Sequence, residues 1–259
     1  MKARTAVMAA TTAALCLAAV SCGPSGGDSS HGKDSGRASS PSSAMPSGDD
    51  ASPPPPAPSP STLPAGTGKV LTEAELTEAA LATGDVADYE VTPLQGSQDT
   101  GTEKAESQAC RPLAAVINGA PEPAATATVF RTVMDRSEEG KDDQTVVTEI
   151  LTSHPKGGAQ QVLRDVRDAV QACAGGFRTS SDEGPSTYSK VELLDAPRAG
   201  EESIAYQVTG NIEGDKVPLV FQLVRRGSTV VTFYVADFVD ATTPQLPAEV
   251  VTAQLAKLP

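Results

Sequence analysis

The side chains most able to do chemistry in this chain are four cysteines, two histidines and a few adjacent carboxylates. A Ser–His–Asp hydrolase would need His154 as its general base, because His31 lies alone in a Ser/Pro/Gly-rich stretch. No GxSxG turn is present, and Pro155 follows His154 at the end of a predicted strand. We interpret His154 as a strand-end residue, and a hydrolase is the alternative.

Paired carboxylates could serve glycoside hydrolysis. The pairs are Glu138-Glu139, Asp142-Asp143 and Glu201-Glu202. Each lies beside turn residues in an acidic chain that has no tryptophan for a sugar platform. We therefore predict solvated charges.

The connector from Asp135 onward begins like a calcium loop, with a glycine at Gly140. Val146 stands where such a loop needs a bidentate glutamate, so an acidic hairpin loop is the better interpretation. Nucleotide-binding glycine loops are also absent from the sequence. We predict no catalytic, cofactor-binding or metal-binding residues, and not an enzyme.

The first residues have the three-part build of a secretory signal. Lys2 and Arg4 precede an apolar run that is too short to span a membrane as a helix. Residues 19–22, Ala-Val-Ser-Cys, resemble a bacterial lipobox, in which the cysteine receives a diacylglyceryl group and becomes the mature N-terminus. We predict a signal peptide over residues 1–21 and lipidation of Cys22. The alternative is an ordinary secretory signal that leaves Cys22 as an idle thiol.

Residues 22–68 are predicted to form a disordered linker. Thirty of the 46 residues in 23–68 are Ser, Pro or Gly, and almost none could seed a core. Such a linker reaches about 35 to 40 Å as a flexible coil, and the four prolines at 53–56 stiffen part of it. Acyl chains on Cys22 would hold the protein on a bilayer, with the following domain held off its surface.

Residues 69–259 are long enough for one domain with a hydrophobic core. They contain 16 Lys and Arg against 29 Asp and Glu, which accounts for the net charge of −13 of the whole chain. Such a domain is repelled by nucleic acid and by anionic headgroups. We therefore predict no nucleic-acid partner and no polybasic membrane contact.

Cys110 and Cys173 remain once Cys16 is removed with the signal and Cys22 is lipidated. An even pair in a chain directed outside the cytoplasm predicts a disulfide. It would close a loop of about 64 residues and stabilise the fold by about 4 kcal/mol on the loop-entropy model. A redox pair is the alternative, but CxxC spacing and an adjacent histidine are both missing.

Hydrophobic periodicity predicts the secondary structure of the domain. Thr72 and Glu75 form a capping-box pattern for the first helix, with Gly84 as its end signal. The predicted helices are 72–82, a second helix around Cys110, 159–174 and 247–258. The predicted strands are 89–94, with Pro93 indicating an edge, then 125–135, 144–152, 187–195, 202–214, 216–227 and 228–238.

These elements predict an α+β fold, in which helices flank an antiparallel sheet with one disulfide and a disordered tether precedes the domain. The run 125–152 is predicted to form a hairpin, and the last four strands a meander. Phe221, Leu223, Phe233 and Tyr234 are predicted core residues.

Five segments carry a family resemblance: SQACRPLAAV, QQVLRDVRDAVQACAGGF, GEESIAYQV, VPLVFQLVRRG and STVVTFYV. Together they resemble PknH-like extracellular sensor domains, which occur on a mycobacterial kinase and in free-standing actinobacterial lipoproteins. The resemblance covers most of residues 70–258. It implies a helix-flanked antiparallel sheet with a cleft, disulfide bracing and an extracytoplasmic ligand. Mycobacterial members usually have two disulfides, whereas this domain can form one, and signalling would require a partner because the sequence has no kinase domain.

We therefore expect a lipid-anchored protein on the outer face of the cell membrane. It would act as a ligand-binding or sensor module, with an unidentified extracytoplasmic ligand or protein as its partner. The alternative is a carrier of lipid or another apolar envelope molecule, held in a cavity between sheet and helices.

Overall fold

The computed structural model describes residues 68–94, 101–138, 146–195, 198–212, 214–238 and 240–259. The predicted signal peptide at 1–21, Cys22 and the linker up to residue 67 lie outside the described residues. Glu139, Asp142 and Asp143 of the predicted acidic loop also lie outside them. Within the described ranges, no helix is both long enough and apolar enough to cross a bilayer.

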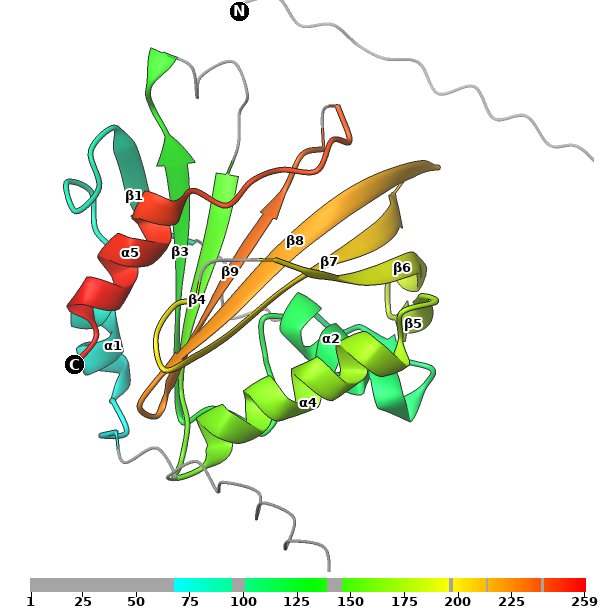
Figure 1. Ribbon diagram of the computed structural model, residues 1–259, viewed down its shortest axis with the longest axis horizontal. Coiled ribbons are helices and arrows are strands. Elements are labelled where there is room, and N and C mark those ends of the chain that lie inside the picture. Colours follow the sequence, from blue (N-terminus) through cyan, green and yellow to red (C-terminus); the bar gives the residue numbers. More distant parts are fainter. Residues whose placement is uncertain (1–67, 95–100, 139–145, 196–197, 213, 239) are drawn as a thin grey trace, which may run out of the picture. The chain divides into compact units, whose positions relative to one another are not determined.

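One antiparallel sheet of nine strands organises the described part of residues 68–259, in the order β1-β3-β4-β9-β8-β7-β6-β5-β2 (Figure 1). The strands are β1 Tyr89–Pro93, β2 Lys104–Ala105, β3 Ala127–Asp135, β4 Val146–Ser153, β5 Phe177–Ser181, β6 Gly184–Leu194, β7 Glu202–Ile212, β8 Asp215–Arg226 and β9 Thr229–Ala236. The predicted hairpin (β3, β4) and meander (β6 to β9) are both present, and β4 joins them by pairing with β9. β1 lies at the sheet edge, as Pro93 predicted.

Helices cover both faces of this sheet, so the predicted α+β class is confirmed. The helices are α1 Glu73–Ala79, the short 3-10 helix η1 Gln108–Cys110, α2 Arg111–Ile117, α4 Gly158–Ala172 and α5 Ala248–Lys257. α2 and α4 lie on one face, and α1 and α5 lie on the other (Figure 1).

The core under α4 follows from its amphipathic sequence. Val162, Val166 and Val170 recur at helical spacing and are buried, so this stripe faces the sheet. It packs in one cluster with Tyr206 and Leu223 from the central strands. The clearest helix of the sequence therefore anchors this half of the core.

The core under α1 and α5 is built from β-branched strand residues and two short helices. Val231, Phe233 and Val235 alternate along β9 and are fully buried on this face. Leu76 of α1 and Val250 of α5 cover them. α5 begins at Ala248 and ends at Lys257, close to its predicted bounds.

α1 is shorter than predicted. Its capping box is present, with the Thr72 side chain bonded to the Glu75 N–H and the Glu75 carboxylate bonded to the Thr72 N–H. The helix ends at Ala79, however, before Ala82 and well before Gly84. The Leu81 N–H donates to Oε1 of Gln254 in α5 at 2.9 Å instead of continuing the helix.

Two strands, β2 and β5, were not predicted from the sequence. β2 has only two residues, and β5 buries a single apolar side chain, Phe177. Neither presents enough alternating apolar residues to be recognised locally. Both are held by pairing, since β5 bonds to β6 and β2 bonds to β5.

Candidate functional site

A surface groove of about 480 Å³ lies between helix α2 and the segment that leads into β2. Its lining combines alanines with charged and amide side chains. The lining residues are Gly101, Thr102, Glu103, Lys104, Ala105, Arg111, Ala114, Ala115, Asn118, Ala120 and Glu122. The volume falls in the range of about 300 to 1,000 Å³ that is usual for small-ligand sites.

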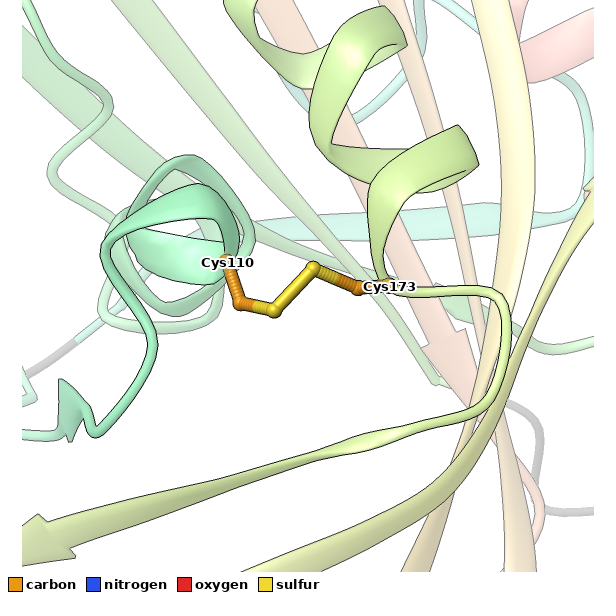
Figure 2. The surroundings of a disulfide bond; sticks show 2 residues. All are labelled: Cys110 and Cys173. Atoms are coloured by element: carbon orange, nitrogen blue, oxygen red, sulfur yellow. A yellow bond between two sulfur atoms is a disulfide. The ribbon is translucent and has the colours of Figure 1, made fainter. Parts of the chain in front are cut away.

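A disulfide holds one wall of the groove. Cys110 immediately precedes α2 and bonds to Cys173 at the end of α4, with their Cα atoms 6.0 Å apart (Figure 2). This confirms the predicted pair. α2 has only seven residues, too few to be stable alone, and Pro112 lies in its first turn, where the missing N–H costs nothing. The cross-link therefore fixes this wall against α4.

Asn118 holds the opposite wall in register. Its Oδ1 accepts the Glu103 N–H at 3.0 Å, and its Nδ2 donates to the Glu103 carbonyl at 2.8 Å. The Asn118 carbonyl accepts the Gly101 N–H at 3.1 Å. A Cβ atom at Gly101 would lie 2.5 Å from Asn118 Oδ1, so this close approach requires glycine.

The Glu103 carboxylate binds the segment to the sheet. It accepts hydrogen bonds from the hydroxyls of Tyr188 at 2.7 Å, Ser186 at 2.9 Å and Thr179 at 3.0 Å. Burial and the bond to Glu103 raise the pKa of Tyr188 above its ordinary value. With three donors already engaged, Glu103 positions the wall of the groove.

The rim carries charges of both signs. Arg111 and Glu122 form an ion pair at 3.2 Å with both side chains more than half exposed, and Lys104 lies on the same rim. Exposed pairs contribute little stability, so a ligand can separate them at small cost. An alanine floor below such a rim suits a small polar ligand or a short peptide segment.

Sequence reasoning did not single out Glu103, Asn118 or Arg111. One signal was available, because Ser186 and Tyr188 alternate on one face of β6 and buried hydroxyls require acceptors. That signal could not name Glu103, which lies 83 residues from Ser186 along the chain.

His154 directly follows β4 and is completely buried. Its Nε2 lies 2.9 Å from Thr152 Oγ1. Burial lowers the pKa of His154, and the Pro123 carbonyl partly opposes that effect. The His154 imidazole is therefore not accessible to a substrate from solvent.

The prediction of solvated charge is wrong for Glu202. Its side chain is 18% exposed and bonds both Arg167 of α4 at 3.0 Å and Arg225 of β8 at 3.4 Å. Glu201, which is half exposed, also pairs with Arg225 at 2.6 Å. A turn signal could not reveal that a buried arginine lies beside both carboxylates.

The predicted core residues occupy the sheet. Phe221, Leu223 and Phe233 are buried, and Tyr234 is half-buried with its ring stacked on Phe221. Across the described part of the chain, no group of three or more His, Cys, Asp or Glu side chains is placed to hold a metal ion.

No protein-family model matches this chain, and no curated protein matches it in sequence. Among solved structures, the chain is similar to the extracellular domain of PknH from Mycobacterium tuberculosis. The TM-score is 0.47 and the identity 11%, over 73% of this chain and 95% of the PknH chain.

Proposed function

We propose that this chain is an extracytoplasmic binding or sensing module, anchored to the outer face of the cell membrane through Cys22, and that the groove beside α2 receives its ligand. The observation that carries the proposal is the disulfide-braced groove itself. The Cys110–Cys173 bond holds a surface hollow of ligand size, with convergent polar groups over an alanine floor.

The disulfide also supports a location outside the cytoplasm, since such bonds persist in oxidising compartments. The sequence supports the anchor, because a signal-like segment ends at Cys22 and a Ser/Pro/Gly-rich linker follows. Anchor and linker together would present the groove to molecules of the envelope.

Membrane fractionation of a Cys22→Ser variant tests the anchor. We expect this variant to leave the membrane fraction, because the protein would have no acyl chains. Cys16→Ser is the matched control and should stay with the membrane. Equal membrane retention of both variants would contradict the anchor.

A thermal-shift screen with envelope glycan fragments, phospholipids and short peptides tests the groove. A ligand at 100 times its Kd stabilises the folded state by about 2.7 kcal/mol, which is several degrees for a domain of this size. Ala115→Trp would fill the groove and should abolish the shift. Ala256→Trp, at an exposed position on α5, should preserve it. A shift that survives Ala115→Trp would refute the site.

A further inference from the structure

A second hollow, of about 250 Å³, lies between α4 and the paired strands β6 and β7. Its apolar part consists of Val170 from α4, Leu193 and Leu194 from β6, and Ile204 and Ala205 from β7. Two arginines, Arg167 and Arg198, belong to the same lining. This hollow is separate from the groove beside α2.

The outer edge of β6 is open next to this hollow. β5 pairs with β6 only over its first residues, from Gly184 to Tyr188. Beyond a bulge, the Val191 N–H donates outward, to the Ala174 carbonyl at 3.3 Å. Backbone groups alternate in direction along an antiparallel strand, so the N–H and C=O of Leu193 also point outward.

Leu193 is left uncovered at this edge. Within the described ranges, no hydrogen bond reaches the outward backbone groups of Leu193, and its side chain is 66% exposed. An open strand edge beside an exposed apolar side chain is a ready template for another strand.

The charge of the hollow is opposite to that of the chain. The net charge of the chain is −13, yet the hollow is flanked by two guanidinium groups. Arg167 bonds to Glu202 at 3.0 Å, and Arg198 forms no ion pair with any described residue. Arg198 is exposed and free to bind a carboxylate bidentately.

We infer that this edge binds an extended peptide that carries carboxylate side chains. The peptide would add to β6 through the backbone of Leu193, place an apolar side chain on Leu193 and Val170, and direct a carboxylate to Arg198. This is recognition by strand addition, in which main-chain bonds supply affinity and side-chain pockets supply selectivity. An acyl chain would suit the apolar floor but would leave the Leu193 backbone groups without partners.

Titration of the folded domain with two acetylated hexapeptides, (Val-Asp)3 and (Val-Lys)3, tests the inference. We expect (Val-Asp)3 to bind, with at least tenfold slower hydrogen exchange at the Leu193 amide, and (Val-Lys)3 not to bind. Arg198→Glu should weaken binding at least tenfold. Arg164→Glu changes the charge equally at an exposed α4 position outside the hollow and should have little effect.

Binding that is insensitive to Arg198→Glu, an unprotected Leu193 amide, or equal binding of both peptides would overturn the inference. So would binding of decanoate at this hollow when (Val-Asp)3 does not bind. Ala115→Trp separates the two proposals, because it should block the α2 groove and leave (Val-Asp)3 binding unchanged.

Discussion

Two charged side chains are buried on opposite faces of the same sheet, and their surroundings differ. Arg225 of β8 lies on the α4 face, where Glu201 and Glu202 both bond its guanidinium and the Gly227 carbonyl accepts a further hydrogen bond. Glu149 of β4 lies on the α1 and α5 face, completely buried. Neither of its carboxylate oxygens has a hydrogen-bond partner of normal geometry among the described residues.

The nearest basic residue in the sheet register does not relieve Glu149. Arg131 stands directly opposite it on β3, but its guanidinium donates to the carbonyls of Leu81, Phe130 and Thr77. Burial raises the pKa of Glu149 to about 8, against the weaker opposing effects of the Leu81 backbone, Arg131 and Lys257. Glu149 is therefore mostly protonated at neutral pH.

One sheet therefore tolerates buried ionisable groups in two ways. Where opposite charges converge, as around Arg225, the buried group is bonded to its charged partners. Where apolar side chains surround the group, as around Glu149, the group takes up a proton instead. The α4 face is thus braced by a disulfide and the ion pairs of Arg225. The α1 and α5 face is held by packing, by the bonds of Gln254 to Leu81 and Ala79, and by the partly exposed ion pair of Lys257 with Asp85 at 2.6 Å.

Replacing both Cys110 and Cys173 with alanine should have the largest effect, because it removes the covalent brace from the α4 face. The two residues are 63 positions apart, and loop entropy predicts a loss of about 4 kcal/mol in the free energy of unfolding. Urea denaturation measures this loss, and reduction of the wild-type protein should reproduce it. An unchanged midpoint in the variant would show that packing alone braces both faces.

Arg225→Met should come next, since it leaves Glu202 in a largely buried position with only Arg167 as a partner. Breaking a buried pair costs about 3 to 5 kcal/mol, and the half-exposed Glu201 reduces the expected loss to about 3 kcal/mol. Arg178→Met breaks an exposed pair with Glu106 and should cost under about 1 kcal/mol. Equal losses in urea denaturation would remove the contrast between buried and surface pairs.

Glu149→Gln should change the pH dependence of stability. The folded pKa of Glu149 is about 8 and the ordinary value is 4.5. Stability due to the protonated acid is therefore fully present below pH 4.5, is lost as pH rises toward 8, and changes little above 8. The slope approaches about 1.4 kcal/mol per pH unit between pH 4.5 and 7, so a variant that matches the wild type at pH 4.5 should exceed it by about 3 kcal/mol near pH 7.

Thermal or urea unfolding of both proteins between pH 4.5 and 9 measures this difference. Glu78→Gln, at an exposed position on α1, is the matched control and should leave the slope unchanged. If wild type and Glu149→Gln run parallel across this range, Glu149 is ionised and paired after all.

Thr72→Ala should give the smallest effect, as it removes one half of the capping box that starts α1. Loss of such a cap costs about 1 kcal/mol. Thr77→Ala, within the same helix, is the control and should be close to neutral. If Thr72→Ala lowers the free energy of unfolding by more than about 2 kcal/mol, α1 contributes more to the stability of this face of the sheet than the packing of α5 does.

The predictable part of this fold consists of elements with a local pattern. α4 was predicted from the spacing of Val162, Val166 and Val170, and the start of α1 from Thr72 and Glu75. β2 and β5 had no such pattern, and the pairing of β4 with β9 joins segments that no local rule connects. The burial of Glu149 could also have been predicted, because Glu149 lies on the same face of β4 as Val147 and Leu151, two apolar residues that are buried.

The candidate site was predictable only in its disulfide. Cys110 and Cys173 were the pair that remained after Cys16 and Cys22 were assigned, and the structure joins them. The hydroxyls around Glu103 and the amide bonds of Asn118 come from separate elements, so no motif marked them.

By itself, the sequence determined the α+β class, the amphipathic elements and the cysteine pair, because periodicity, caps and cysteine number depend on neighbouring residues and composition. Only the tertiary structure decided that Arg225 has charged partners, that the Glu149 carboxylate has no hydrogen-bond partner of normal geometry among the described residues, and that a groove forms beside α2. The physical reason is that desolvation and charge pairing depend on which distant segments pack together, and these meet only when the sheet has formed.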